Sequence, residues 1–263
     1  MIKEQSKQSL RLLTYNIQVG IETSAYHHYL TRGWRHFLPF PTRQFNLDKM
    51  AMLLRQFDLV ALQETDAGSL RSGNINQVEY LAQAADFPYW WLRVNRRLGR
   101  FARHSLGLLS RYRPTEIQEI SLPGRIPGRG AILARFGHGE HTLLVIAAHL
   151  SLGKRSRRRQ LDYLRTLVHG EQHVILMGDM NCTSQDLLQD GLLQENMRQA
   201  DPNLLASYPS WRPRRSLDHI LVSSSLQVHH TQVLDYQLSD HLPLAMELSL
   251  PIQIELGGMA LAS

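Results

Sequence analysis

The eight residues Val174–Asn181, which read VILMGDMN, join an apolar run to a cluster of polar side chains. Four successive apolar residues predict a strand that is covered on both faces. Gly178 lets the backbone approach a neighbour closely where the strand ends. Asp179 and Asn181 are two residues apart, so in an extended chain they would point to the same side and could position and deprotonate a water molecule. The alternative is an Asx turn that only closes the strand.

Five further apolar runs stop at, or begin just after, a residue that can hold a metal or a phosphate. They are TYN (Thr14–Asn16), QE (Gln63–Glu64), HLS (His149–Ser151), LDH (Leu217–His219) and SDH (Ser239–His241). In a layered sheet protein the strand ends gather at one rim. We therefore predict that these residues, far apart in sequence, meet at one rim, and that the active site lies there.

Apolar runs rich in β-branched residues predict the strands. Besides Val174–Met177 they are Leu12–Ile17, Leu59–Gln63, Leu106–Ser110, Ala131–Phe136, Leu143–His149, Leu217–Val222 and Leu244–Leu250. Several follow one another with only a turn between. The pattern predicts an α/β protein with two sheets packed face to face and helices outside. We expect one domain over residues 1–263, with loose tails at 1–9 and 252–263.

Three helices are predicted between the strands. Asn46 is the expected N-cap of a helix that carries Met50 and Leu54 on one stripe. Asn76 and Glu79 resemble a capping arrangement for a second helix. The third helix is expected through Leu161, Leu164 and Val168.

Composition limits the class of protein. The formal charge is +6, from 29 basic and 23 acidic residues, which favours an anionic partner such as nucleic acid, a phosphate ester or an acidic lipid surface. The alternative is a mildly basic protein without such a partner. The single cysteine, Cys182, excludes an intrachain disulfide, fits a reducing compartment, and is expected to be buried rather than to act as a nucleophile. MIKEQSKQSL is no secretory signal, and the longest apolar run is too short for a bilayer span, so we expect a soluble cytoplasmic chain.

Residues 22–45 form an insert that is rich in aromatic side chains, among them Trp34 and Phe37. It could wall a substrate cleft or lie on a partner or an anionic membrane at the inner face. The alternative is a loop that folds back on the core.

Glu64 and Asn16 are the predicted core of a magnesium site. Each follows a strand, and Mg²⁺ prefers hard oxygen ligands such as carboxylates and amide oxygens. Asp240 could also reach a cation or align its neighbour. No His/Cys cluster with zinc spacing is present, so a structural zinc site is not expected.

Asp218 and His241 are predicted to form a pair. A buried carboxylate that accepts a hydrogen bond from an imidazole fixes its tautomer and favours the protonated ring. Such a histidine can act as a general base or as a cation against a phosphate oxygen. His149 is a second candidate for phosphate contact.

Arginines gather at several places in the chain. Those at the start of the third helix oppose the helix dipole, which favours an anion nearby; a solvated charged turn is the alternative. They are Arg155, Arg157, Arg158 and Arg159. Basic residues also follow Trp211, and such a mixture suits a stacked or backbone-held substrate. We take Arg129, Arg158 and Trp211 as candidate substrate-binding residues.

The ordered series TYN, QE, HL, GDMN, LDHI and SDHLP resembles the endonuclease/exonuclease/phosphatase superfamily, over Leu12 to Leu250. The resemblance implies a deoxyribonuclease-I-like four-layer α/β sandwich, dependence on a divalent metal (Mg²⁺, or Mn²⁺) and cleavage of phosphoester bonds. The roles it implies are Glu64 as main metal ligand with Asn16 nearby, Asp179 and Asn181 at the attacking water and the phosphate, His149 and His241 on the phosphate, Asp218 as partner of His241, and Asp240 near the metal.

The chain departs from the DNA-repair members in two stretches. SYPSWRPRRSLDH precedes the LD motif, and GRIPGRGA stands where those members carry a tyrosine. It looks closer to a small, uncharacterised bacterial branch that is similar to phospholipid and sphingomyelin phosphodiesterases.

We predict a monomeric hydrolase in which an activated water attacks phosphorus in line. Nucleic acid is the favoured substrate, and a phospholipid or small phosphoester is the alternative. A binding module with an inactive site is the non-enzyme alternative, and it would need a lost catalytic position, whereas every expected position is filled.

Overall fold

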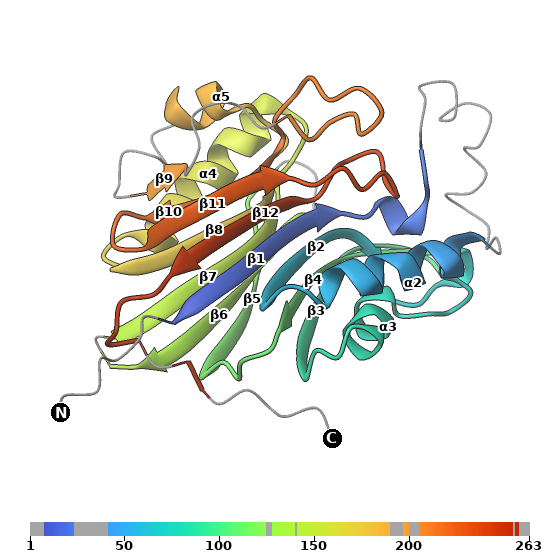
Figure 1. Cartoon of the computed structure of the whole chain (residues 1–263). Coiled ribbons are helices and arrows are strands. Elements are labelled where there is room, and N and C mark those ends of the chain that lie inside the picture. Colours follow the sequence, from blue (N-terminus) through green and yellow to red (C-terminus); the bar gives the residue numbers. More distant parts are fainter. Residues whose placement is uncertain are drawn as a thin grey trace.

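The computed structural model describes residues 8–23, 42–124, 128–139, 141–189, 197–199, 206–254 and 256–257. Within these residues two six-stranded sheets pack face to face (Figure 1). The first sheet has the order β11 (Gln227–Val233), β12 (Leu244–Ser249), β1 (Ser9–Asn16), β2 (Leu59–Asp66), β4 (Ala102–Ser110), β3 (Tyr89–Leu98). The second has the order β5 (Glu116–Ser121), β6 (Gly130–His138), β7 (His141–His149), β8 (His173–Asp179), β10 (Asp218–Ser223), β9 (Met197–Gln199).

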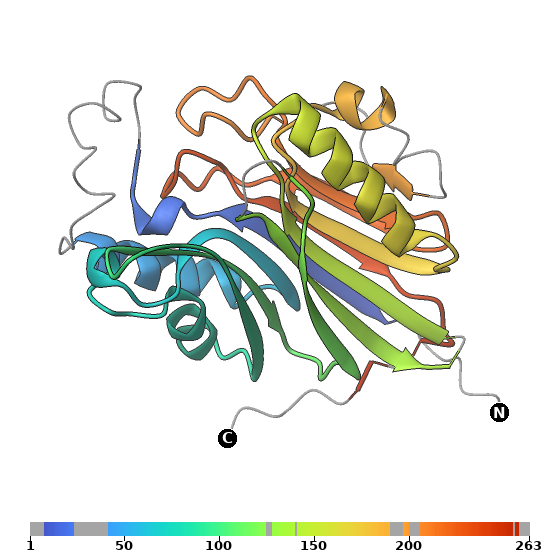
Figure 2. The same cartoon turned by 180° about the vertical axis from the view of Figure 1, so that it is seen from behind.

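Helices cover the two outer faces. The first sheet carries α2 (Thr42–Leu54) and α3 (Gln77–Ala84), and the second carries α4 (Lys154–Val168) and α5 (Ser184–Gln189) (Figures 1 and 2). Two short 3-10 turns, η1 (Gln18–Gly20) and η3 (Leu70–Ser72), follow β1 and β2. The four-layer sandwich predicted from the sequence is confirmed.

Each sheet is buried on both faces, which explains the continuous apolar runs. In β1, Leu12 packs into the core between the sheets, while its neighbour Leu13 packs beneath the helices of the outer layer. In β8 all seven residues are buried. Because side chains alternate across a strand, such a strand needs an apolar residue at almost every position.

Two of the three helix predictions are confirmed as made. Asn76 caps α3, and its side chain accepts a hydrogen bond from the Glu79 backbone. The third helix is α4. The capping role of Asn46 is wrong, because α2 already includes Thr42 and Asn46 lies inside it. The Asn46 side chain instead donates to the carbonyl oxygen of Gly20 at 3.2 Å, so a tertiary contact uses the group that would have capped a helix.

Some described residues near the two ends belong to the fold rather than to the loose tails that the sequence predicts. Ser9, placed in a loose tail by the sequence, pairs with Ser249 in the first sheet. Ile254 and Leu256 are buried in the core between the sheets, so the expected tail at 252–263 is wrong for these two residues. Residues 24–41 of the aromatic insert lie outside the described residues. The prediction of one domain stays a prediction.

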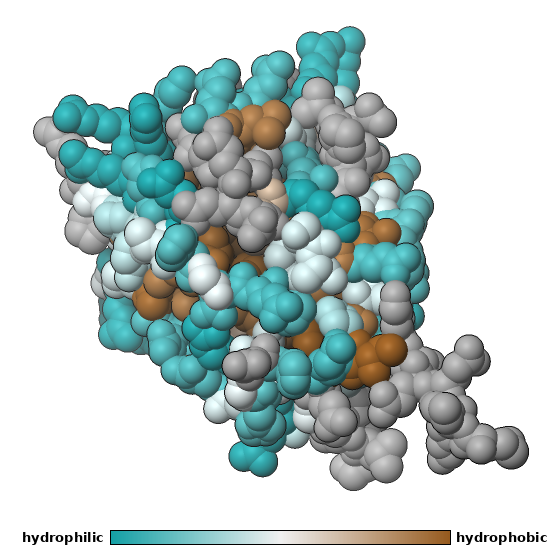
Figure 3. All heavy atoms as spheres, turned by 90° about the vertical axis from the view of Figure 1, so that its left-hand side faces the viewer, coloured by the Kyte–Doolittle hydropathy of each residue, from teal (hydrophilic) through white to brown (hydrophobic). Residues whose placement is uncertain are grey.

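Figure 3 shows the face at the left of Figure 1, where the described side chains are mostly hydrophilic and the apolar ones are scattered. Among the described helices, none combines the length and the apolar composition that crossing a bilayer requires.

Gly178 permits the close approach of β8 to β7, and it directly precedes Asp179. Its φ is +153°, and a Cβ there would lie 1.9 Å from the carbonyl oxygen of Ala148, which is backbone and cannot move aside. We expect Gly178→Ala to destabilise the protein by about 3 kcal/mol or more, measured by urea unfolding.

The matched control for this prediction is Gly153→Ala. Gly153 has a φ of −75°, and a Cβ there meets nothing within 4 Å. Its replacement should cost no more than about 1 kcal/mol. Equal unfolding midpoints for the two variants would contradict the close-approach argument.

Candidate active site

Strand direction brings the polar motifs to one rim of the sandwich. β1 runs parallel to β2, and β7 runs parallel to β8, so each pair ends on one side. His149 lies beside Asp179 in the second sheet, and Asp218, at the start of antiparallel β10, faces Asp179 from the other side. Asn16, at the end of β1, donates a hydrogen bond across the sandwich to Asp179 at 3.1 Å. The two sheets therefore meet at this rim through their polar strand ends.

Glu64 lies in a bulge rather than at the end of its strand, which corrects the expected strand end. β2 continues to Asp66, and its pairing with β4 shifts between Leu62 and Thr65. Glu64 has a φ of +54°, a strained value for a residue with a side chain. Bulges re-aim side chains next to functional sites. Here the bulge turns a carboxylate toward the rim, where its side chain is 38% exposed.

Asp179 is the centre of the cluster. Its Oδ1 accepts from the Asn181 backbone at 2.9 Å, while Oδ2 lies 3.5 Å from Nε2 of His149 and 3.9 Å from Nε2 of His241. Burial raises the pKa of Asp179 to about 7, although His241 pulls it down. A carboxylate with a pKa near neutrality can accept a proton at physiological pH.

One alternative from the sequence placed Asp179 and Asn181 in an extended chain, with both side chains on the same side. The structure does not have this arrangement. The φ of Asn181 is +51°, and its backbone donates to the Asp179 carboxylate, so the pair forms the Asx turn named as the other alternative. The Asn181 amide donates to the carbonyl of Leu150 at 2.9 Å. That bond ties the turn after β8 to the segment after β7, and it leaves Oδ1 as the atom that can accept a hydrogen bond from water.

His241 and Asp218 form the pair that the sequence predicts. Nδ1 of His241 lies 2.7 Å from Oδ2 of Asp218, and both side chains are buried. Burial disfavours the charged ring, but Asp218 and Asp179 outweigh it, and the pKa of His241 is raised well above its usual value. Ser207 donates a second hydrogen bond to the same carboxylate oxygen, and Tyr208 packs against the imidazole with ring centroids 4.9 Å apart. His241 is therefore held as a cation with Nε2 facing Asp179.

His149 has the opposite character. Burial lowers its pKa well below the usual value, and the charges of Arg129 and His241 lower it further. Nη1 of Arg129 lies 2.8 Å from Nδ1 and 2.9 Å from Nε2 of the ring. Burial lowers the pKa of Arg129, while Glu64 and Asp179 raise it. The site thus places a neutral imidazole and a guanidinium opposite the His241 cation, with Asp179 in between.

The loop before β12 holds Asp240 close to Glu64. Ser239 donates to the carbonyl of Asn16 at 2.6 Å, and its hydroxyl oxygen lies 3.2 Å from Oδ1 of Asp240. Partial burial, and then the charge of Asp240, raise the pKa of Glu64. The two carboxylates are therefore close enough to repel each other, which is the electrostatic signature of a site that a cation would stabilise.

The donor set at the rim fits a hard divalent cation. Glu64 and Asp240 supply carboxylate oxygens, while the Asn16 amide group hydrogen-bonds to Asp179 and Glu64 and its oxygen accepts from the Gln18 backbone. Asp179, Asp218 and His241 also have ligand atoms within 4.8 Å of one another. That second group is a poorer cation site, because His241 Nδ1 is bonded to Asp218 and a protonated ring does not ligate a metal. Asp218 Oδ1 is buried and has no hydrogen-bond partner among the described residues.

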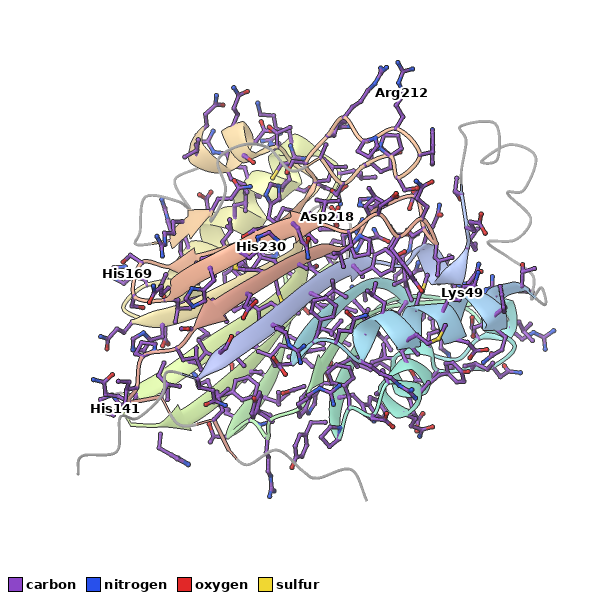
Figure 4. All side chains as sticks on the ribbon, in the orientation of Figure 1. Lys49, His141, His169, Arg212, Asp218 and His230 are labelled. Atoms are coloured by element: carbon purple, nitrogen blue, oxygen red, sulfur yellow. The ribbon has the colours of Figure 1, made fainter. Side chains whose placement is uncertain are left out.

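The other predicted residues lie farther out. Arg158 is exposed on α4, and Trp211 is half-buried in the loop before β10, so their substrate contacts stay predictions. Cys182 is buried, as expected, and His219 donates to its carbonyl. Figure 4 places Asp218 among the converging strand ends, whereas His141 and His169 lie at the opposite end of the molecule.

Sequence reasoning counted Arg96 only as basic surface and did not single out His104, so neither was assigned to the site. Both line a cavity of about 510 Å³ that also borders Glu64, Arg129 and His149. His104 was one histidine among thirteen, and nothing in its neighbourhood in the sequence distinguishes it. Its pairing opposite Asp66 across β2 and β4 is what brings it to the site.

Comparison with known proteins bears on the family and the fold of the chain. The model of the Endonuclease/Exonuclease/phosphatase family matches residues 13–241. A search of curated proteins found no match. Among solved structures, an endonuclease/exonuclease/phosphatase from Beutenbergia cavernae has 20% identity and a TM-score of 0.71, covering 97% of this chain and 74% of the other.

Two further solved structures show how widely the fold is used. The mannosyl-6-phosphatase of Bacteroides thetaiotaomicron has 16% identity and a TM-score of 0.64, covering 91% of this chain and 99% of the other. TDP2 of D. rerio, complexed with a single-strand DNA product, has 16% identity and a TM-score of 0.65, covering 92% and 99%. At such identities these likenesses concern the fold, and they span unlike substrates. The family model matches most of the chain, at residues 13–241, so the chain belongs to the Endonuclease/Exonuclease/phosphatase family. Membership of this family supports the conclusion that the protein is an enzyme that hydrolyses phosphoester bonds.

Proposed function

We propose that this protein is a divalent-metal-dependent phosphodiesterase that cleaves nucleic acid by in-line attack of water. The observation that carries the proposal is the placement of Asp179 between a protonated His241 and a neutral His149, at the rim where Glu64 and Asn16 also lie. Such a site combines a proton acceptor, a cation and hydrogen-bond donors within one pocket, which is what phosphoryl transfer requires of a protein.

The chain's own residues divide the work. Asp179 orients the attacking water and accepts its proton, since its pKa of about 7 leaves it ionised for much of the time at neutral pH. Asn181 holds that water through its amide oxygen. His241, kept charged by Asp218, donates from Nε2 to a phosphate oxygen, and His149 contacts another from the opposite side.

The expected metal ligands are Glu64, Asn16 and Asp240. When bound, Mg²⁺ or Mn²⁺ would neutralise phosphate charge and stabilise the leaving oxygen. Asn16 also donates a hydrogen bond to Asp179. This bond connects the expected metal ligands to the residue that accepts the proton.

Nucleic acid is favoured as substrate by the net charge of +6 and by the arginines near the site. Arg129 reaches into the site, and Arg96 lies on the cavity wall. The competing class, a phospholipid or small phosphoester at a membrane surface, draws its support from the aromatic composition of residues 22–45.

A substrate panel tests the proposal. Single- and double-stranded DNA and RNA are compared with anionic phospholipid vesicles and sugar phosphates, in magnesium, manganese, calcium and chelator. We expect metal-dependent cleavage of nucleic acid, with an affinity that falls steeply with salt. Cleavage of phospholipid alone, with vesicle co-sedimentation that is lost in Trp34→Ala and Phe37→Ala, would assign the competing class instead.

Glu64→Gln tests the metal ligand set. The substitution keeps size but removes the charge, so we expect the magnesium concentration for half-maximal activity to rise about tenfold or more. A magnesium titration of initial rates measures it. Glu79→Gln, on α3, is the matched control and should leave the titration unchanged. Identical titrations for Glu64→Gln and the unmodified protein would remove Glu64 from the ligand set.

A further inference from the structure

The cavity of about 510 Å³ continues from the cleavage site toward the edge of the sandwich. Glu64 and His149 form its inner end, and Arg96 of β3 and Ser156 of α4 belong to its outer walls. Its volume lies within the range for sites that hold a small ligand or one nucleotide-sized group. The cavity is therefore larger than the cleavage chemistry needs, and it has room for a neighbouring part of the substrate.

Positive charge dominates the described lining. Arg96 and Arg129 face one carboxylate, Glu64, and that carboxylate is committed to the expected metal. The remaining polar lining is uncharged and includes the hydroxyls of Ser105 and Ser156. An anionic group is the occupant that such a lining favours.

Gly128 builds the contact between the two sheets at this place. Its φ is +113°, and a Cβ there would lie 3.2 Å from Cβ of Arg96 and 3.2 Å from the carbonyl oxygen of Asn95. The absence of a side chain lets the segment before β6 lie against Arg96 and carries Arg129, the next residue, into the site. One glycine thus sets two arginines, from opposite sheets, along the same cavity.

The first turn of α4 forms another wall. Gly153 precedes the helix, and no side chain caps its first turn. The exposed Lys154 and Arg155 add positive charge there, which opposes the helix dipole in the absence of an anion. A phosphate in the cavity would relieve this repulsion, so the cluster that the sequence singled out has a physical reason to lie next to the cavity.

We propose that this cavity binds a second phosphate of the substrate, one nucleoside away from the phosphate that is cleaved. The proposal rests on the proposed function for the position of the cleaved phosphate. The preferred substrate would then be a nucleic-acid strand that carries a further phosphate, adjacent or terminal, one nucleoside from the cleaved one. Arg96 would be a specificity-determining residue.

Dinucleotides with and without an added phosphate test the proposal. Thymidine dinucleotide is compared with its forms that carry a phosphate at the 5′ or the 3′ end, with steady-state rates in magnesium. We expect the unmodified enzyme to prefer one phosphorylated form about tenfold or more, mainly through KM. Arg96→Gln should lose the preference. Arg97→Gln, whose side chain is exposed and does not line the cavity, should keep it.

A second variant and a binding measurement keep the outcome decisive. Ser156→Glu places a negative charge on the cavity wall and should also erase the preference, while an acidic residue in the first turn favours the helix. Calorimetry with thymidine 3′,5′-bisphosphate in chelator should show binding that weakens about tenfold or more in Arg96→Gln and stays unchanged in Arg97→Gln.

The two proposals fail in different ways. Absence of hydrolysis of every phosphodiester, with bisphosphate binding that depends on Arg96, would end the proposed function and keep the phosphate site. Hydrolysis without any preference for a phosphorylated end, or a preference that survives in both Arg96→Gln and Ser156→Glu, would overturn the phosphate site and leave the proposed function standing.

Discussion

Asp179→Asn is expected to lower kcat/KM for a phosphodiester by about 10³-fold or more. The asparagine keeps the shape and can still accept from the Asn181 backbone, but it cannot take a proton from water and no longer carries the charge that faces His149 and His241. Steady-state kinetics in magnesium measure the loss. A variant with more than a tenth of the original activity would show that another group accepts the proton.

The same variant should fold at least as stably at alkaline pH. The folded-state pKa of Asp179, about 7, lies above the ordinary value for an aspartate, so the stability that this group contributes below pH 4 is lost as the pH rises toward 7. Asparagine has no such dependence. We expect the melting temperature of Asp179→Asn to exceed that of the unmodified protein by a larger margin at pH 8 than at pH 5. If Asp179→Asn melted at a lower temperature than the unmodified protein at pH 8, its loss of activity would be explained by misfolding.

Asp218→Asn is expected to reduce kcat by about 10³-fold, because His241 loses the carboxylate that fixes its tautomer and its charge. The ring is a cation below its folded-state pKa and loses that charge as the pH rises through it. With Asp218 neutral, the charges that still oppose the effect of burial on the pKa of His241 are those of Asp179 and Asp240. The pKa of His241 should then fall, and the alkaline limb of the pH–rate profile should move to lower pH.

The control for the pH profile is His141→Gln, which removes a histidine at the far end of the molecule and should leave both limbs in place. A melting curve separates the electrostatic effect from loss of structure. An alkaline limb that stays fixed in Asp218→Asn, with activity reduced, would mean that His241 does not act as the cation.

The sequence was most informative where strands are buried on both faces. β1, β7 and β8 appear as apolar runs because each lies in the middle of a sheet between two layers. The strands that were not predicted are β3, β5, β9 and β11, which form the edges of the two sheets and keep polar residues exposed. Half-exposed strands carry a weaker signal than central ones.

The sequence predicted which residues form the site, but not their backbone conformations or their protonation. Asn16, His149 and Asp218 stand next to apolar runs, so strand direction alone predicts where they gather. The conformation of Asn181 could not be read from the sequence, because extended and Asx-turn backbones both suit an Asp–x–Asn segment. Arg96 and His104 were missed for a related reason, since only the pairing of β3 with β4 and of β4 with β2 brings them to the cavity.

By itself, the sequence determined the layers, the family and the chemical groups at the rim, because burial on two faces and the order of polar motifs are properties of the chain. Tertiary structure alone decided that Asp179 has a pKa near 7, that His241 is charged and that His149 is neutral. Protonation depends on burial and on charges a few ångströms away, and in this protein those charges come from strands far apart in the sequence.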